Sequence, residues 1–299
     1  MPSAGTIASD QGGTVKPTFV KEIKALAKPA LFPDGGGYLS LPVASVRQLA
    51  QSHGLEGHEI EIAALENNIV PERYARNLSF FSPAEQTTLL RATVALVGLG
   101  GLGGAVTEVL ARTGIGNLVL IDGDRFEDSN LNRQLLGHEA AIGRFKATAA
   151  AERVGAINSS IGASVHTAFL GHATAQHLLS GADVVVDCLD NIATRFVLEA
   201  AARKQGLPLV SAALAGAFGQ ITTIYPDDPG LVSIYGEPAD IPSRGAETTL
   251  GTLCFTAMHM ATLEGAEVVK ILLGRGSLLR RKLLLVDLMD HTYEIVALD

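Results

Sequence analysis

The sequence predicts an α/β fold with a doubly wound, mostly parallel sheet and an antiparallel extension at its C-terminal end. Two observations lead to this prediction. Short apolar runs alternate with helix-patterned segments through most of the chain, and a glycine-rich turn joins the first of these runs to a helix. Strict alternation of strand and helix favours right-handed crossovers, which place helices on both faces of a parallel sheet.

The first part of the chain lies outside that alternation. Residues 1–18 are small, polar and glycine-rich, a composition typical of unstructured segments. Residues 40–50 and 59–67 have helical patterns and predict a short helical hairpin. We therefore divide the chain into an N-terminal extension, residues 1–70, and a main domain, residues 71–299.

A glycine turn is the first strong signal in the main domain. Residues 94–97 form an apolar run, residues 98–104 read GLGGLGG, and a helical pattern follows over residues 105–112. Such a turn is a phosphate site, because glycines let backbone amides approach a phosphate and the helix dipole adds about half a positive charge. The Rossmann-like dinucleotide fingerprint is matched by Gly98, Gly100 and Gly103. The turn indicates a nucleotide without identifying it.

Strand and helix patterns flank and follow this turn. The predicted strands are residues 118–122, 163–167, 183–187, 208–213 and 219–224. The predicted helices are residues 83–90, 143–157, 173–179 and 192–205. A loop rich in Pro, Gly and Asp follows at residues 226–249, long enough to be functional or mobile. A long helix over residues 250–273 precedes two closing strands, residues 282–287 and 292–298, which predict an antiparallel hairpin.

Composition and charge argue against several classes of protein. A hydrophobic content of 47% is enough for a sizeable core, and a net charge of -8 without a basic block argues against nucleic-acid binding. Apolar runs stay shorter than the roughly 18 residues that would span a bilayer. Two cysteines are too few for a disulfide framework, and signal-peptide features are missing at the N-terminus. We expect a cytoplasmic protein without membrane or nucleic-acid partners.

Polar side chains gather after the predicted strand 118–122, in the segment DGDRFEDSNLNRQ. Asp122 closes the strand where a ribose-binding acid is expected. A dehydrogenase needs only that acid, whereas here Asn, Arg and Gln side chains follow in quick succession. Arg133 offers a bidentate fork for phosphate oxygens, and Lys146 adds a point charge from a helix start. The segment therefore predicts a site that handles phosphate groups.

A second acidic segment, Asp187-Cys188-Leu189-Asp190-Asn191, follows the strand predicted at residues 183–187. The carboxyl ends of parallel strands are where open α/β sheets bind ligands. A carboxylate beside a triphosphate is most simply a magnesium ligand, because Mg²⁺ bridges phosphate oxygens and one or two carboxylates. Asp190 is our candidate for that ligand.

Taken in order, these segments resemble the ThiF/MoeB/HesA family of ubiquitin-activating-enzyme-like adenylyltransferases. The resemblance covers about residues 70–298 and rests on six motifs. They are Arg73-Tyr74-x-Arg76-Asn77, Gly98-x-Gly100-Gly101-Leu102-Gly103, Asp122-x-Asp124, Ser129-Asn130-Leu131-x-Arg133-Gln134, Gly143-x-x-Lys146 and Asp187-Cys188-x-Asp190-Asn191. The family implies a homodimer that uses MgATP to adenylate the C-terminal glycine carboxylate of a small ubiquitin-like sulfur carrier, of the thiamine or molybdopterin type, releasing pyrophosphate.

The resemblance also implies roles for the matching residues. The nucleotide-binding set is Gly98, Gly100, Gly101, Gly103, Asp122, Asp124, Asn130, Arg133, Gln134, Lys146 and Asp190. The catalytic set is Arg76, Arg133, Lys146 and Asp190. Arg76 would reach into the partner subunit's site and contact the terminal phosphates, Asp190 would hold magnesium, and Gln134 would orient a neighbour. We rate Arg73 below Arg76, as a structural residue that stacks or bridges to a nearby acid.

Cysteine usage departs from the family. Many members bind structural zinc through two Cys-x-x-Cys pairs, whereas this chain has only Cys188 and Cys254. A tetrahedral site needs four ligands, so no zinc is predicted. Members that form a persulfide or thioester use a cysteine in the loop corresponding to residues 226–249, which has none. We expect both cysteines to be buried small hydrophobic residues, and adenylation to be the activity that the residues support.

Three other functions stay open on the sequence alone. The chain could bind a partner without catalysis, although the phosphate-handling residues argue against this. An enzyme of the same family could activate a small molecule or a tRNA base, although the lack of a basic patch weighs against tRNA. A NAD-dependent oxidoreductase would also satisfy the glycine turn, but it would leave Arg76, Arg133 and Lys146 without a role.

Overall fold

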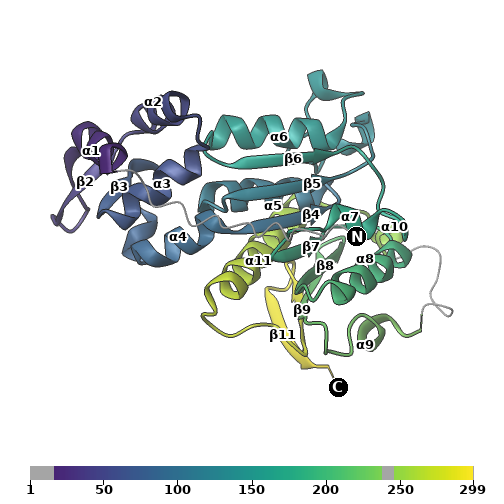
Figure 1. The fold of residues 1–299 in the computed structure, drawn as a ribbon. Coiled ribbons are helices and arrows are strands. Elements are labelled where there is room, and N and C mark those ends of the chain that lie inside the picture. The colour runs from purple at the N-terminus through teal and green to yellow at the C-terminus, as the bar shows by residue number, and fades with distance from the viewer. Residues whose placement is uncertain (1–16, 238–245, 299) are drawn as a thin grey trace, which may run out of the picture.

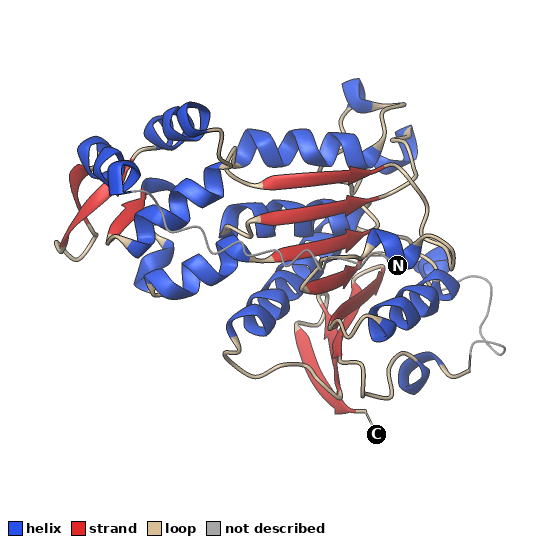
Figure 2. Ribbon diagram, viewed as in Figure 1, coloured by secondary structure: helices blue, strands red, loops and turns tan. Residues whose placement is uncertain are grey.

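The structure is a computed structural model that describes residues 17–237 and 246–298 (Figure 1). Residues 1–16, from the segment predicted to be unstructured, and residues 238–245, from the predicted loop, lie outside the described ranges. The described chain has a large sheet covered by helices and a smaller sheet with its own helices at one end of the molecule (Figure 2).

The large sheet has eight strands in the order β11-β10-β9-β8-β7-β4-β5-β6. Their bounds are β4 (Thr93–Val97), β5 (Asn117–Ile121), β6 (Gly162–His166), β7 (Val184–Asp187), β8 (Leu209–Ala215), β9 (Phe218–Ile224), β10 (Lys282–Asp287) and β11 (Thr292–Ala297). β4 to β8 pair in parallel, and β9, β10 and β11 add on antiparallel. The predicted doubly wound sheet with an antiparallel extension is confirmed.

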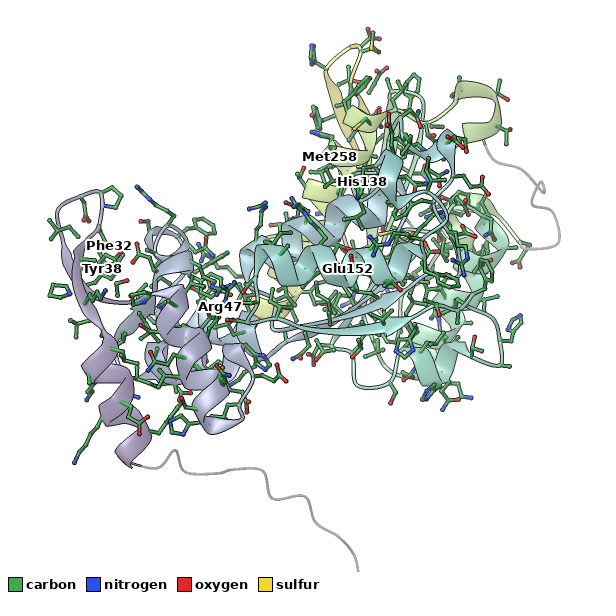
Figure 3. The ribbon with its side chains drawn as sticks, turned by 90° about the horizontal axis from the view of Figure 1, so that it is seen from above. Phe32, Tyr38, Arg47, His138, Glu152 and Met258 are labelled. Carbon is green, nitrogen blue, oxygen red and sulfur yellow. The ribbon has the colours of Figure 1, made fainter. Side chains whose placement is uncertain are left out.

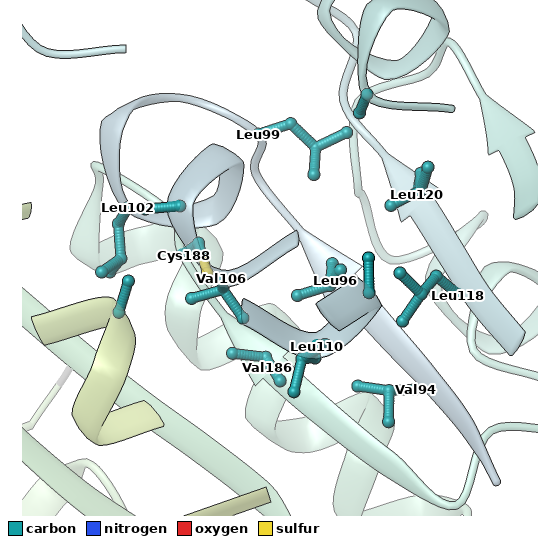
Figure 4. Close-up of a cluster of buried hydrophobic side chains, with 14 of the residues drawn as sticks. Val94, Leu96, Leu99, Leu102, Val106, Leu110, Leu118, Leu120, Val186 and Cys188 are labelled. Atoms are coloured by element: carbon teal, nitrogen blue, oxygen red, sulfur yellow. The ribbon is translucent and has the colours of Figure 1, made fainter. Parts of the chain in front are cut away.

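Helices cover both faces of this sheet. They are α4 (Pro83–Arg91), α5 (Gly101–Thr113), α6 (Lys146–Ile157), α7 (Ala175–Leu178), α8 (Ile192–Lys204), α9 (Val232–Tyr235), α10 (Glu247–Leu250) and α11 (Cys254–Leu273). Side chains of β4 alternate between two cores: Val94 and Leu96 pack with α5, α6 and α11, as Figure 4 shows in part, whereas Ala95 and Val97 pack with α7 and α8. Burial on both faces explains the continuous apolar runs of the central strands.

The N-terminal extension has a core of its own. Its elements are α1 (Pro17–Leu26), β1 (Lys28–Leu31), β2 (Gly37–Leu41), α2 (Val43–His53), α3 (Gly57–Glu66) and β3 (Ile69–Pro71). Buried side chains including Ile23, Leu41 and Ile60 form a separate hydrophobic cluster. Figure 3 shows Phe32 and Tyr38 at the outer end of this extension, well away from His138 and Met258 in the main body.

Two predicted helices differ from the structure. Residues 40–50 do not form one helix, because Ser40 and Leu41 end β2 and Pro42, in an extended conformation, caps α2. The extension thus contains a three-stranded sheet in addition to its helices, whereas the sequence predicted only a helical hairpin. The helix predicted over residues 250–273 starts at Cys254, since Gly251 takes a left-handed φ of 71° between α10 and α11.

A helix that crosses a membrane must meet requirements of length and apolar character. Among the helices of residues 17–237 and 246–298, none is long and apolar enough to cross a membrane.

Candidate functional site

A cavity of about 900 Å³ opens at the carboxyl ends of the parallel strands. The predicted residues in its wall are Gly98, Gly100, Gly101, Asp122, Asp124, Arg133, Gln134, Lys146 and Asp190. They come from the segments that follow β4, β5 and β7, from the first residue of α5 and from the first residue of α6. Three predicted residues, Gly103, Asn130 and Arg76, lie outside this wall.

The glycine turn lets α5 start directly against β4. Gly98 has a φ of 88°, and a Cβ there would lie 2.6 Å from the Cys188 carbonyl oxygen. A Cβ at Gly103 would lie only 1.8 Å from the Gly98 carbonyl oxygen. Gly103 therefore serves close packing of helix on strand, whereas the α5 N-terminus, where Gly100 is the N-cap and offers no side-chain cap, leaves its first amides for an anion.

Asp122 is fixed at the end of β5 by two backbone amides. Its Oδ2 accepts a hydrogen bond from the Leu99 amide and its Oδ1 from the Asp124 amide, each at 2.7 Å. Burial raises the pKa of Asp122 above its ordinary value, although these hydrogen bonds act in the opposite direction. Each carboxylate oxygen keeps a lone pair that can accept a hydroxyl donor from a ribose.

Two cations contribute charge to the cavity. Lys146, only 7% exposed, places its Nζ 3.1 Å from Asp124 Oδ2. Arg133 donates from Nη1 to the Ser129 carbonyl at 2.8 Å and to Asn132 Oδ1 at 2.9 Å. Because these two Arg133 acceptors are neutral, the guanidinium charge stays available to phosphate oxygens.

Gln134 lines the cavity, and its side-chain oxygen is buried and unsatisfied. The residue is 5% exposed, and its Oε1 has no hydrogen-bond partner within the described part of the chain. A buried polar atom without a partner costs about 1–3 kcal/mol. The oxygen is thus a buried acceptor without a donor, and the role of orienting a neighbour stays a prediction.

Asp190 stands in the cavity wall above a buried ionic cluster. Asp187, which ends β7, accepts hydrogen bonds from Arg195 Nη1 at 2.9 Å and Ser211 Oγ at 2.7 Å. Arg195 also donates to the carbonyls of Ala212 and Leu189. The bond to Leu189 fixes the backbone immediately before Asp190. Sequence reasoning missed Arg195. The sequence feature that could have indicated it is its place in the first turn of α8, directly after the strand that ends at Asp187.

Asn130 lies outside the cavity wall. It is buried at the end of a short 3₁₀ helix, Asp128–Asn130, where its Oδ1 accepts a hydrogen bond from the Glu127 amide at 3.1 Å. A short amide side chain often satisfies nearby backbone in this way. In the structure the Asn130 side chain thus shapes the loop that carries Arg133, and its contact with phosphate stays a prediction.

Arg76 lies at the other end of α5 from the cavity. It is exposed, and its neighbour Asn77 donates to the carbonyl of Thr113, the last residue of α5. A helix of 13 residues is about 20 Å long, so Arg76 is far from the cavity of its own chain. Its action on a partner subunit stays a prediction.

Arg73 has the structural role expected for it. Its Nε lies 2.9 Å from Oε1 of the fully buried Glu61, which belongs to α3. Arg73 also donates to Asn158, and Asn158 donates to Tyr74 Oη at 2.8 Å. These contacts join the extension to the main body.

The cysteines differ from each other. Cys188 is buried as predicted, and its Sγ donates to Glu264 Oε2 at 3.7 Å. Cys254 is exposed, which corrects the prediction: it is the first residue of α11, and its neighbours Leu253 and Phe255 are exposed as well. In the described ranges, His, Cys, Asp and Glu do not gather in groups of three or more that could hold a metal ion.

Comparison with known sequences decides the family. The profile of the ThiF family matches residues 74–299. The chain belongs to the ThiF family. It is 35% identical over 230 residues to the SAMP-activating enzyme E1 of Haloferax volcanii, covering 75% of this chain and 84% of that one.

Two further relatives of this ThiF-family chain are longer proteins. It is 35% identical over 221 residues to the adenylyltransferase and sulfurtransferase MOCS3 of Drosophila ananassae, covering 72% of this chain and 48% of MOCS3. It is 31% identical over 236 residues to the probable adenylyltransferase/sulfurtransferase MoeZ of Mycobacterium tuberculosis, covering 76% of this chain and 59% of MoeZ. The chain thus spans about half the length of these two relatives.

Solved structures show the same fold. Escherichia coli MccB with ATP superposes with a TM-score of 0.66 at 21% identity, over 86% of this chain and 79% of that one. PaaA superposes with a TM-score of 0.62 at 22% identity, over 76% and 82%. The predicted family and fold are both confirmed.

Proposed function

We propose that this ThiF-family adenylyltransferase uses MgATP to adenylate the C-terminal glycine carboxylate of a small ubiquitin-like sulfur carrier protein, releasing pyrophosphate. Support comes from the relatives, of which one is named a SAMP-activating enzyme E1 and two combine adenylyltransferase with sulfurtransferase in their names. The loop of residues 226–249 has no cysteine, which limits the proposal to the adenylation step, and the chain lacks the Cys-x-x-Cys pairs that would hold zinc.

One observation carries the proposal. A single cavity is lined by an uncapped helix start, a fixed ribose-type acid, two cations and Asp190. The glycine turn, which a Cβ would obstruct, fits the phosphates of a nucleotide, and the unsatisfied Gln134 Oε1 fits a hydroxyl or amino donor of its ribose or base. A dinucleotide site would make less use of the cations Arg133 and Lys146.

The nucleotide would lie along the carboxyl ends of β4 and β5. Asp122 would accept hydrogen bonds from the ribose hydroxyls, and the amides around Gly100 and Gly101 would face the α-phosphate. Arg133 and Lys146 would bind phosphate oxygens. Asp190 would hold a Mg²⁺ ion, which would neutralise charge on the phosphates.

The chemistry requires position and charge. A carboxylate oxygen of the carrier attacks the α-phosphorus, the bond to the β-phosphate breaks, and pyrophosphate leaves. No nucleophile of this chain is needed, because the residues hold the two reactants together and stabilise the charge that develops. The cavity continues past the nucleotide residues to Phe218, Leu285 and Glu294, which leaves room for an extended tail.

The test is ATP–pyrophosphate exchange with magnesium, run with candidate ubiquitin-like proteins that end in Gly-Gly. Exchange should depend on the carrier and fall by about 10²-fold or more in Asp190→Ala, the scale of losing one transition-state charge. Asp183→Ala is the matched control, since Asp183 lies at the other end of β7 and binds the Thr93 amide. Tight NAD binding without exchange for any carrier would reject the proposal.

The proposed homodimer has its own test. Arg76 is too far from its own cavity, so we propose that it completes the site of a partner subunit. Mixing inactive Arg76→Ala and Asp190→Ala chains should restore part of the exchange activity, because a hybrid dimer contains one intact site. If mixing restores nothing, Arg76 does not act across subunits.

A further inference from the structure

Phe169 is an exposed aromatic side chain in the wall of the cavity. It follows β6 in the loop of residues 167–170, is 71% exposed, and lines the cavity together with Ala168 and Leu170. Exposed aromatic rings that border a concave polar site are typical of ligand contacts. None of the roles proposed above uses this ring.

Gly123 leaves the space that this ring fills. A Cβ at Gly123 would lie 2.7 Å from Cδ2 of Phe169 and 2.8 Å from its Cγ and Cε2. The φ of Gly123 is not among the positive values of the described chain, so the backbone there does not require glycine. The ring therefore rests directly on the main chain next to the ribose-type acid Asp122.

The loop that carries Phe169 is held on both sides. Before the loop, the His166 carbonyl accepts a hydrogen bond from the Asp122 amide at 3.1 Å. After it, Thr174 Oγ1 accepts from the Gly171 amide at 3.0 Å, and its one hydroxyl proton is shared between the carbonyls of Gly171 at 3.2 Å and Phe169 at 3.4 Å. Leu170 packs against the core beneath α7 and α8. A side chain on a fixed backbone gives up little additional freedom when a ligand covers it.

We propose that Phe169 is the stacking platform for the adenine base of the nucleotide. This inference rests on the proposed function, which puts the ribose on Asp122. A base attached to that ribose lies next to Gly123, where the Phe169 ring offers a flat apolar surface. Stacking of a base on an aromatic side chain is sequence-tolerant and changes affinity by about tenfold or more.

The test uses the absence of tryptophan from this chain. In full-length Phe169→Trp, the introduced indole is the sole tryptophan, and stacking of a base should quench its fluorescence. Titration with AMPCPP should give a saturable quench, while inorganic tripolyphosphate should give none. Phe32→Trp is the matched control and should not respond, because Phe32 lies at the outer end of the extension (Figure 3).

Calorimetry on the wild type and Phe169→Ala completes the test. AMPCPP should bind Phe169→Ala about tenfold or more weakly than the wild type, and Phe169→Tyr should restore most of the affinity. Equal affinity of Phe169→Ala and wild type would overturn the stacking role and leave the proposed function intact.

Failure of the proposed function has a different signature. It would appear as a wild type that does not bind AMPCPP at all. Titration of Phe169→Trp with ADP-ribose then decides the inference: a quench keeps Phe169 as a platform for an adenine base, and no quench overturns it.

Discussion

Two buried arginine–carboxylate pairs, one at each end of the large sheet, are built differently. Beneath the cavity, Asp187 accepts hydrogen bonds from Arg195, Ser211 and the Leu189 amide. At the joint with the extension, Glu61 lies 2.9 Å from Arg73 Nε, yet neither of its oxygens has a partner with good hydrogen-bond geometry in the described chain. Both carboxylates are fully buried.

The difference shows what a buried carboxylate needs. Desolvation of an ion is offset only when its lone pairs are also satisfied. At the joint this offset is incomplete, and burial raises the pKa of Glu61 to about 7 in spite of the nearby Arg73. The Asp187 carboxylate thus has hydrogen-bond donors from three groups, whereas the Glu61 carboxyl at the joint can take up a proton near neutral pH.

Removing Arg195 should have the largest effect. Arg195→Ala leaves Asp187 without its cation and the carbonyls of Ala212 and Leu189 without their donor. We expect a loss of about 4 kcal/mol in the free energy of unfolding, measured by urea denaturation. Arg91→Ala is the control, since its exposed pair with Glu66 should contribute less than about 1 kcal/mol. Equal losses in Arg195→Ala and Arg91→Ala would show that the buried pair with Asp187 contributes no more to stability than an exposed ion pair.

Removing Arg73 should cost somewhat less. Arg73→Ala leaves the buried Glu61 carboxylate without its cation. Glu61 can lower the cost of burying this charge by taking up a proton. At pH 8 we expect a loss of about 3 kcal/mol in the free energy of unfolding, and a smaller loss at pH 5. A loss that does not change between these two pH values would show that Glu61 is not the group affected.

The pH dependence of stability should be the smallest effect. The pKa of Glu61 is raised in the folded protein, so its carboxyl keeps a proton that the unfolded chain releases between about pH 4.5 and 7. Its contribution is therefore complete below pH 4.5 and is lost as the pH rises to 7. The difference in unfolding free energy between the wild type and Glu61→Gln should fall by about 2 kcal/mol from pH 5 to 7, and a constant difference would contradict this.

Much of the main domain follows from local sequence. Strands such as β4 are buried on both faces, so their side chains are apolar without interruption, and the glycine turn marks where α5 begins. The sheet of the extension could not be predicted in this way. Leu39 pairs with Ile69 across two intervening helices, and nothing near either residue indicates that partner.

The candidate site was predictable where a motif fixes the backbone. Asp122, Lys146 and Asp190 follow strand ends or start a helix, so their position in the sheet brings them to one cavity. Arg195 and Phe169 could not be found in the same way, because their partners converge only in the fold. The exposure of Cys254 likewise depends on how α11 packs on the main body, which the residues around Cys254 do not show.

The buried thiol beneath the glycine turn gives this protein an internal reporter. Burial, with the carboxyls of Glu264 and Asp187, raises the pKa of Cys188 well above its ordinary value, while Cys254 is open to reagent. Alkylation should therefore occur in two phases, fast at Cys254 and slow at Cys188. The slow rate measures how often β7 and α5 separate locally and expose Cys188. A nucleotide bound at the glycine turn should lower this rate further.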